Sequence, residues 1–245
     1  HQRDSTIDNG GIMTIFPVSK VNALRRRAAK ACPEPKDAPD GWSRSTSDPM
    51  KLLRVFKSLQ MKPGFVLRAY QYSEGGNGNG FIWAMPESAP FPYPEECSRR
   101  KDVFLQPPKP PQALDQLMDA IDGDGSPWSY LSASLFDREA AEFGAMWHGC
   151  EWSEHDIIGA DPWQSDFNPW GVFDSLDEWT WNESKPETWE PSFVETDDSL
   201  SVSFLTFSGL GTTAIYRHTN TFKSGSYAFN AERATVAEGP DGFIH

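Results

Sequence analysis

The chain lacks any long apolar run, and no window approaches the roughly 18 continuous apolar residues that suggest a membrane-spanning helix. Its first residues also lack the apolar core of a secretory signal peptide. Cysteine is scarce, because Cys32, Cys97 and Cys150 are the only three and lie far apart in the sequence. This spacing excludes a disulfide framework and fits free thiols in a reducing compartment. We therefore expect a cytoplasmic protein with no membrane association.

The short catalytic signatures that spacing alone can identify are also missing. The chain has no H-E-x-x-H motif, no pair of C-x-x-C motifs, no G-x-S-x-G elbow and no Walker loop. The glycine-rich stretch 73–79, SEGGNGN, comes closest to a phosphate loop, but its spacing is not G-x-G-x-x-G. A strand-like sequence follows it, where a phosphate loop needs a helix N-terminus. We interpret it as the mobile tip of a β-hairpin.

Basic residues are almost absent from residues 151–198, which contain 14 acidic residues and one basic residue, Lys185. The first 62 residues have the opposite balance, with 12 lysines and arginines against six acidic residues, although the whole chain carries a net charge of −13. Because phosphate binding needs lysine and arginine, the acidic body excludes nucleic acid on that face. It favours a basic protein partner. The basic N-terminal arm could also pack on its own or a neighbouring chain's acidic surface.

Proline and polar stretches suggest two regions. Residues 1–49 read as a basic and polar arm with a linker, and we interpret residues 1–12 as a leader outside the fold. Residues 50–245 are expected to form a single α+β domain. Three arginines, 25–27, lie on a short helical pattern within the arm. They indicate either a contact with nucleic acid or a partner, or a solvated helix face held by the acidic body.

The strongest helical pattern begins at Ser126, a favourable N-cap, followed by Pro127 at the first helical position. Phe136, Phe143 and Trp147 belong to an apolar stripe with helical spacing, which predicts a long central helix over about 127–147. Alternating residues at 200–207, 212–222 and 225–232 predict three C-terminal strands. With the hairpin at 65–72 and 80–86, this gives an antiparallel sheet of about five strands. The expected fold is α+β, with this sheet packed on the central helix and irregular Pro- and Trp-rich segments outside it.

Tryptophan and carboxylates alternate through residues 150–193. Two interpretations compete, since this segment either folds back onto the core or orders only against a basic partner. We favour folding back, because the six rings carry a large apolar area. The same rings are the candidate partner-binding anchors: Trp152, Trp163, Trp170, Trp179 and Trp181.

His148, Cys150 and His155 form the sharpest chemical pattern. Their spacing offers three ligands to zinc, and Cys150 is a candidate nucleophile with either histidine as its base. A negative helix end and acidic neighbours oppose thiolate formation, however. A structural explanation is simpler: His148 stabilises a helix C-terminus and Gly149 supplies its positive-φ cap.

Arg68 and Arg217 form a second, looser set, because two arginines on one sheet face could clamp an anion. The alternative is ordinary cross-strand pairing of each arginine with Asp or Glu.

Two functions remain from the sequence. The first is a non-catalytic interaction protein, such as an adaptor, assembly factor or inhibitor, which binds a basic partner and has no cofactor. The alternative is an enzyme or a small-ligand or zinc-binding protein with a pocket at the C-terminal end of the central helix. Carbohydrate binding on exposed tryptophans is a weaker third possibility. The missing motifs favour the first function.

Overall fold

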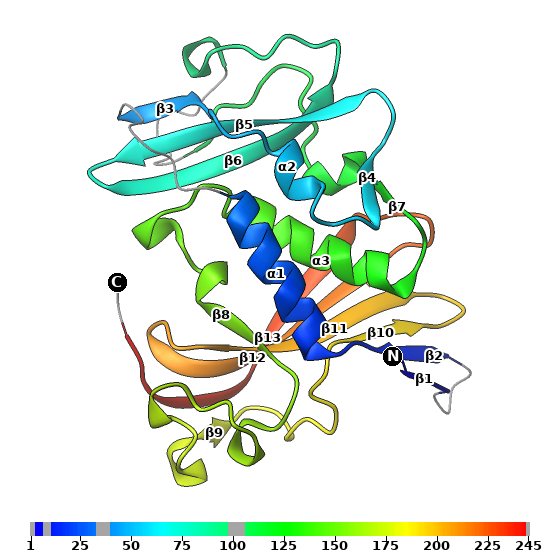
Figure 1. Ribbon diagram of the computed structural model, residues 1–245, viewed down its shortest axis with the longest axis vertical. Helices are drawn as coiled ribbons and strands as arrows, with labels where there is room; N and C mark the ends of the chain where they lie inside the picture. The colour runs from blue at the N-terminus through cyan, green and yellow to red at the C-terminus, as the bar shows by residue number, and fades with distance from the viewer. Residues whose placement is uncertain (1–2, 7–10, 33–39, 98–105, 244–245) are drawn as a thin grey trace. The chain divides into compact units, whose positions relative to one another are not determined.

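The chain folds as two compact units, each with its own β-sheets (Figure 1). The first unit contains the chain up to Ala23, Ser153–Gly225 and the residues from Phe229 onward. The second unit contains Leu24–Trp152 and the loop Ser226–Ala228. The computed structural model describes residues 3–6, 11–32, 40–97 and 106–243.

The first unit is built on an antiparallel sheet of eight strands. Seven follow in the order β1, β2, β10, β11, β12, β13 and β9, and β8 pairs with β11. Along one edge of β11, β10 pairs with residues 200–203 and β8 with residues 205–208. The strands are β1 (Arg3–Thr6), β2 (Ile12–Ile15), β8 (His155–Ile158), β9 (Thr180–Trp181), β10 (Ser192–Glu195), β11 (Leu200–Ser208), β12 (Thr212–Phe222) and β13 (Phe229–Asp241).

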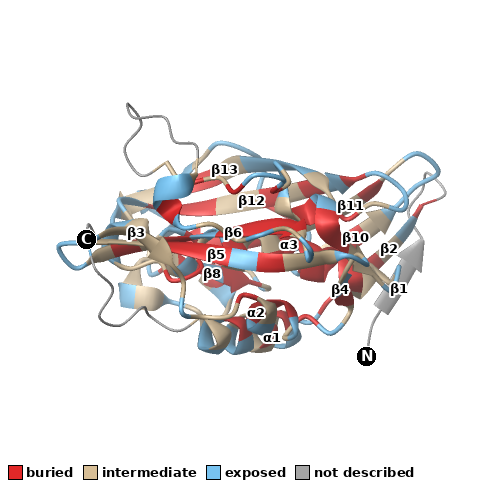
Figure 2. Ribbon diagram, turned by 90° about the horizontal axis from the view of Figure 1, so that it is seen from above, coloured by how far each residue is buried: buried red, intermediate tan, exposed pale blue. Residues whose placement is uncertain are grey.

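Strand β11 is buried on both faces over much of its length (Figure 2). Val202 and Phe204 point to one face and Leu205 and Phe207 to the other, since side chains alternate along a strand. The strands predicted at 200–207 and 212–222 are present. The third begins at Phe229, later than predicted, because the preceding loop belongs to the second unit.

The Trp-rich segment packs against the β11 face that carries Leu205 and Phe207. Phe173 stacks on Trp179 there, with ring centroids 4.9 Å apart and an interplanar angle of 13°. Most tryptophans of the segment therefore fold back onto the core, as their apolar area predicts, whereas Trp170 stays exposed. The other buried members of this cluster are Ile158, Trp189, Ile215, Val236 and Ala237.

The second unit contains a three-stranded sheet in the order β3, β5, β6 and a two-stranded sheet of β4 and β7, both antiparallel. The β5–β6 hairpin closes through Gly75 and Gly76, both with positive φ, and Glu74 pairs with Asn77. The predicted hairpin is thus present, with a tight turn and continuous strand pairing in place of a long tip. The mobility of this turn stays a prediction. The strands are β3 (Gly41–Arg44), β4 (Leu59–Met61), β5 (Phe65–Glu74), β6 (Asn77–Pro86) and β7 (Ile121–Gly123).

The α-helices of the described residues are short. Helix α1 (Val18–Ala31) begins in the first unit and ends in the second, while α2 (Met50–Leu53) and α3 (Pro127–Ala141) lie in the second. No helix of the described chain is both long and apolar enough to cross a membrane. Short 3₁₀ helices occur at η1 (Pro94–Glu96), η2 (Leu117–Ala120), η3 (Trp147–Gly149), η4 (Trp152–Glu154), η5 (Pro162–Gln164), η6 (Pro169–Gly171) and η7 (Leu176–Glu178).

Helix α3 starts as predicted, because the Ser126 Oγ accepts a hydrogen bond from the Ser129 amide at 3.2 Å and Pro127 takes the first position. It ends at Ala141, six residues before the predicted end. Gly144, with φ of +72°, is in the left-handed region, and an extended stretch follows. The apolar spacing continued past Gly144, but the chain had already turned.

The predicted α+β fold is therefore wrong. The chain is mostly β, without a long central helix over 127–147 and without one five-stranded sheet on top of it. The 65–86 hairpin and the C-terminal strands belong to separate sheets in separate units. Residue patterns identified most of these strands, but pairing between distant strands is not encoded in local periodicity.

Parts of the expected N-terminal arm belong to the folded units. Strand β2 pairs with β10, and Phe16 and Val21 are buried. The proposed leader at 1–12 includes β1, which pairs with β2, while residues 1–2 and 7–10 lie outside the described part. A domain boundary at residue 50 stays a prediction.

Candidate functional site

The segment after α3 lies against the β5–β6 hairpin, where the Met146 amide donates to the Gly78 carbonyl at 2.9 Å. A Cβ on Gly149 would lie 2.5 Å from that carbonyl oxygen, so close backbone approach requires glycine here. His148 is exposed, and Cys150 is a half-buried free thiol. The helix-end explanation of W-H-G-C is thus wrong, because this glycine serves a backbone contact and α3 has already ended.

His155 lies elsewhere, buried on β8 in the first unit. Its Nδ1 lies 2.8 Å from the Thr206 Oγ, and His218 Nε2 lies 2.9 Å from the same oxygen. A hydroxyl has one hydrogen to donate and can accept others, so it can donate to one imidazole while accepting from the other. The two histidines thus share one buried hydroxyl in the core of the sheet.

The metal and nucleophile candidates are accordingly divided. His148 and Cys150 belong to the second unit and His155 to the first. Among the described residues, no group of three or more His, Cys, Asp or Glu side chains could hold a metal ion. The zinc hypothesis for H-x-C-x₄-H gains no geometric support.

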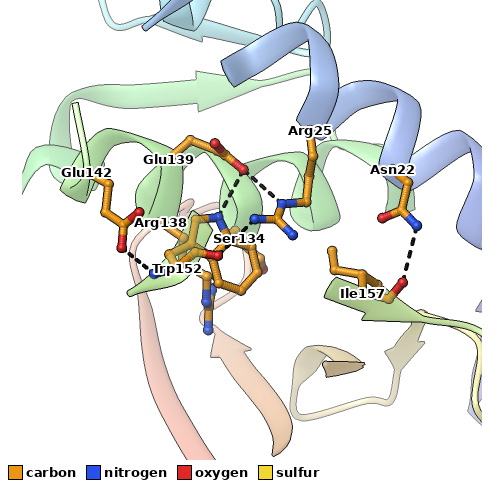
Figure 3. A network of polar contacts seen from close by, with 8 residues as sticks. All are labelled: Asn22, Arg25, Ser134, Arg138, Glu139, Glu142, Trp152 and Ile157. Atoms are coloured by element: carbon orange, nitrogen blue, oxygen red, sulfur yellow. Dashed lines mark hydrogen bonds and ion pairs between the residues drawn. The ribbon is translucent and has the colours of Figure 1, made fainter. Parts of the chain in front are cut away.

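Arg25 on α1 enters a polar network with α3 and Trp152 (Figure 3). Its Nε lies 3.0 Å from Glu139 Oε1, and its Nη2 donates to the Trp152 carbonyl at 3.0 Å. The same carboxylate accepts the Trp152 indole N–H at 2.9 Å, and the guanidinium lies 4.1 Å from the Trp152 ring centroid. A basic side chain is held here by one carboxylate and one tryptophan face together.

Two neighbouring groups complete this network. The Glu142 carboxylate accepts hydrogen bonds from the backbone amides of Glu151 and Trp152, which fixes the start of the acidic segment. Burial and the nearby Glu139 carboxylate raise the pKa of the Cys32 thiol to about 12. Cys32 therefore stays protonated and is a poor nucleophile at neutral pH.

Lys185 repeats the same arrangement in the first unit. Its Nζ lies 2.6 Å from Asp161 Oδ2 and 5.3 Å from the Trp163 ring centroid. The single basic residue of the 151–198 segment is thus also held between a carboxylate and a tryptophan.

Trp170 differs from the other four candidate anchors, because it is 69% exposed. Trp152 and Trp179 are buried, and Trp163 and Trp181 are half-buried. The edge of the Trp170 ring lies against Gly209, where an added Cβ would come within 2.4 Å of the ring. The centroids of the Trp170 and Phe243 rings are 5.4 Å apart. Only part of the indole is covered.

The backbone of Trp170 is also unusual, with φ of +54°. Three non-glycine residues of the described chain have positive φ, and these are Gln112, Trp147 and Trp170. Such a conformation costs about 1–3 kcal/mol. Trp147, at 66% exposure, combines the same strain with the same solvent exposure in the second unit. Neither side-chain burial nor backbone preference explains why a tryptophan occupies each of these two positions.

Carboxylates surround the exposed tryptophan along the chain. Asp174 lies beside Gly171 and accepts a hydrogen bond from the Asn168 side-chain amide at 2.7 Å, so its position is fixed. Twelve of the 14 acidic residues between 151 and 198 are exposed. Leu176, 47% exposed, adds a second apolar side chain to the same stretch.

The two candidate anion-binding arginines belong to different sheets. Arg217 is on β12 in the first unit and pairs with Glu183, with Nε 3.2 Å from Oε2. Arg68 is exposed on β5 in the second unit. They lie on different sheets, so they do not form a clamp on one sheet face.

Sequence reasoning missed the shared Thr206 hydroxyl and the strain at Trp170. Thr206 and His218 lie on adjacent strands. Their side-chain contact follows from the strand register, which the sequence does not show. The P-W-G sequence at 169–171 carried a detectable signal, since a glycine after a proline-led turn marks an irregular backbone. This pattern indicates positive φ at Gly171. In the structure Trp170, the residue before it, has positive φ as well.

Comparison of the chain with protein-family models, curated proteins and solved structures finds no match.

Proposed function

We propose that this chain is a non-catalytic interaction protein that binds a basic protein partner through the acidic surface of residues 151–198. Trp170 is the exposed anchor of this surface in our proposal, and Leu176, further along the same segment, is a second exposed apolar residue. Such a protein acts as an adaptor, assembly factor or inhibitor, and its three free thiols favour the cytoplasm.

The chemistry of recognition is exemplified twice within the chain. Arg25 and Lys185 each pair with a carboxylate and lie near a tryptophan ring. In both cases the carboxylate supplies charge and the indole face supplies cation–π attraction. The same two groups are what a lysine or arginine of a partner needs.

Trp170 is the observation that carries the proposal. It is a large apolar side chain that is mostly exposed, on a strained backbone, within a segment of exposed carboxylates. Exposed tryptophans are enriched among the residues that dominate binding energy at protein interfaces. Surrounding carboxylates steer a basic partner toward the ring.

The proposal revises the set of anchors. Trp152, Trp163 and Trp179 contribute to packing within their own units and are poor candidates for contact with a partner. Trp181 is half-buried against the Trp163 ring at 5.4 Å. In the enzyme alternative, the pocket was expected at the C-terminal end of a central helix over about 127–147. That helix ends at Ala141, and no observation supports the alternative.

Salt dependence of binding tests the proposal. A fluorescent oligoarginine peptide serves as the probe, with oligoglutamate as its control, and anisotropy is measured on the full chain. We expect saturable binding of oligoarginine alone, weakening by about tenfold or more as the Debye length falls from roughly 10 Å to a few ångströms. Binding that is unchanged by salt, or equal for both peptides, would contradict the proposal.

A further inference from the structure

A cavity of about 430 Å³ in the second unit is lined by two arginines, Arg44 and Arg68. Three consecutive hydroxyl residues, Ser45, Thr46 and Ser47, form another part of the wall, and Phe91 contributes an apolar side. The chain as a whole is strongly acidic, with a net charge of −13. Two arginines in its wall make this cavity a local exception, which favours a negatively charged ligand.

Arg44 is fixed in place by the segment 91–93. Its Nε donates to the Pro92 carbonyl at 3.2 Å, its Nη2 donates to the Phe91 carbonyl, and its guanidinium carbon lies 3.8 Å from the Tyr93 ring centroid. These contacts are with neutral carbonyls and a ring, so they do not themselves neutralise its charge. Because an arginine has five N–H donors, Arg44 retains donors beyond these two contacts.

Arg68 is not paired with a carboxylate among the described residues. It follows Leu67 on β5 and is exposed. The one carboxylate of the cavity wall, Asp48, is engaged elsewhere. Its Oδ1 accepts the Met50 amide at 3.0 Å, and its Oδ2 lies 3.7 Å from Arg54 Nη1.

We infer that this cavity binds a small organic phosphate monoester, with Arg68 as the principal contact. Arg44 and the hydroxyls of Thr46 and Ser47 supply further donors. This inference is independent of the proposed partner anchor, Trp170, which belongs to the other unit.

The number and charge of the donors favour phosphate over carboxylate. One guanidinium fork satisfies a carboxylate, which carries one charge and two oxygens. A phosphate monoester carries about −1.5 to −2 charges and three acceptor oxygens, matching two arginines and adjacent hydroxyls. The remaining volume, beside Phe91, accommodates the organic part.

Titration calorimetry of the full chain at low ionic strength tests this site, with phenyl phosphate as the probe and benzoate as the carboxylate control. We expect phenyl phosphate to bind more tightly than benzoate. Arg68→Gln should weaken phenyl phosphate binding by about tenfold or more, because it removes a charge-assisted hydrogen-bonding group. Arg68→Lys, which keeps the charge and loses the fork, should weaken it to a smaller extent.

Arg27→Gln is the matched control, since Arg27 is exposed on α1 in the same unit and the substitution changes the net charge equally. It should leave binding unchanged. Equal loss in Arg68→Gln and Arg27→Gln would overturn the inference, as would the absence of phenyl phosphate binding at millimolar concentration. Benzoate binding as tight as phenyl phosphate binding would overturn the assignment to phosphate. Circular dichroism of each variant verifies that the fold is retained.

Discussion

Arg25 and Glu139 form an ion pair at 3.0 Å although 114 positions separate them in the sequence. Both side chains are largely buried, at 14% and 11% exposure. The pair connects the basic helix α1 to α3 within the second unit, and the Trp152 ring packs against the Arg25 guanidinium. Of the three consecutive arginines, Arg25 is thus a structural contact, while Arg26 and Arg27 remain exposed.

Arg25→Ala should lower the free energy of unfolding by about 2–3 kcal/mol, because it leaves the Glu139 carboxylate largely buried without its cation. Arg27→Ala, on the same helix but exposed, should change it by less than about 0.5 kcal/mol. Urea unfolding of both variants, monitored by tryptophan fluorescence, makes the comparison. Equal effects of the two substitutions would show that the pair contributes little.

Thr206→Val should destabilise the first unit by about 2–3 kcal/mol, since it removes the hydroxyl that His155 and His218 share and leaves two ring nitrogens without that partner. Thr206→Ser retains the hydroxyl and should lose only about 1 kcal/mol for the deleted methyl. The urea midpoints of the two variants test the shared hydroxyl. A valine variant as stable as the serine variant would refute it.

The Cys32 thiol gives a prediction for alkaline pH. Its pKa is raised from 9.0 to about 12 by burial and by Glu139. Well below pH 9 the thiol is protonated in both folded and unfolded chains. Between pH 9 and about 12 only the unfolded chain loses this proton, so folding stability should decline with rising pH across that window.

Cys32→Ala should therefore flatten the decline in stability above pH 9 relative to the unsubstituted chain. In a variant with serine at positions 97 and 150, iodoacetamide should also alkylate Cys32 much more slowly in the native state than in urea. Labelling rates measured at pH 9 provide the direct test. Equally fast labelling in both states would mean that neither burial nor Glu139 protects the thiol.

Gly80→Ala should be strongly destabilising, because a Cβ there would lie 1.7 Å from the Phe143 carbonyl oxygen. Gly76→Ala meets nothing within 4 Å and should cost only about 1–2 kcal/mol for its positive φ. Thermal unfolding midpoints rank the two variants. A Gly76→Ala variant that is less stable than Gly80→Ala would show that close packing at Gly80 is not the main requirement for glycine in this hairpin.

Local patterns predicted several elements of this chain. The alternation at the start of β11 reflects burial of one face, since Leu200 and Val202 are buried while Ser201 is only half-buried. Ser126 with Pro127 marked the start of α3. The apolar area of the Trp-rich segment correctly predicted that it folds back onto the core. Each of these predictions depends on residues close together in the sequence.

Two of the failures involve distant residues. Gly144 read as a small residue within a helix, whereas it has positive φ and its carbonyl accepts a hydrogen bond from the Gln71 side chain of β5 at 2.8 Å. His155 was grouped with Cys150 by proximity in sequence, whereas its partner is Thr206, on a strand that pairs with β8. Strand pairing decides such contacts, and local periodicity does not contain it.

The most direct test of the proposed function compares Trp170→Ala with Trp147→Ala in oligoarginine binding at low salt. The two tryptophans are matched in exposure and in left-handed backbone, so both substitutions remove a similar exposed area and leave the backbone strain in place. Trp170→Ala should weaken binding by about tenfold or more, as loss of an interface anchor does, and Trp147→Ala should leave it unchanged. Equal affinity of the two variants would contradict the role of Trp170 as the anchor for a basic partner.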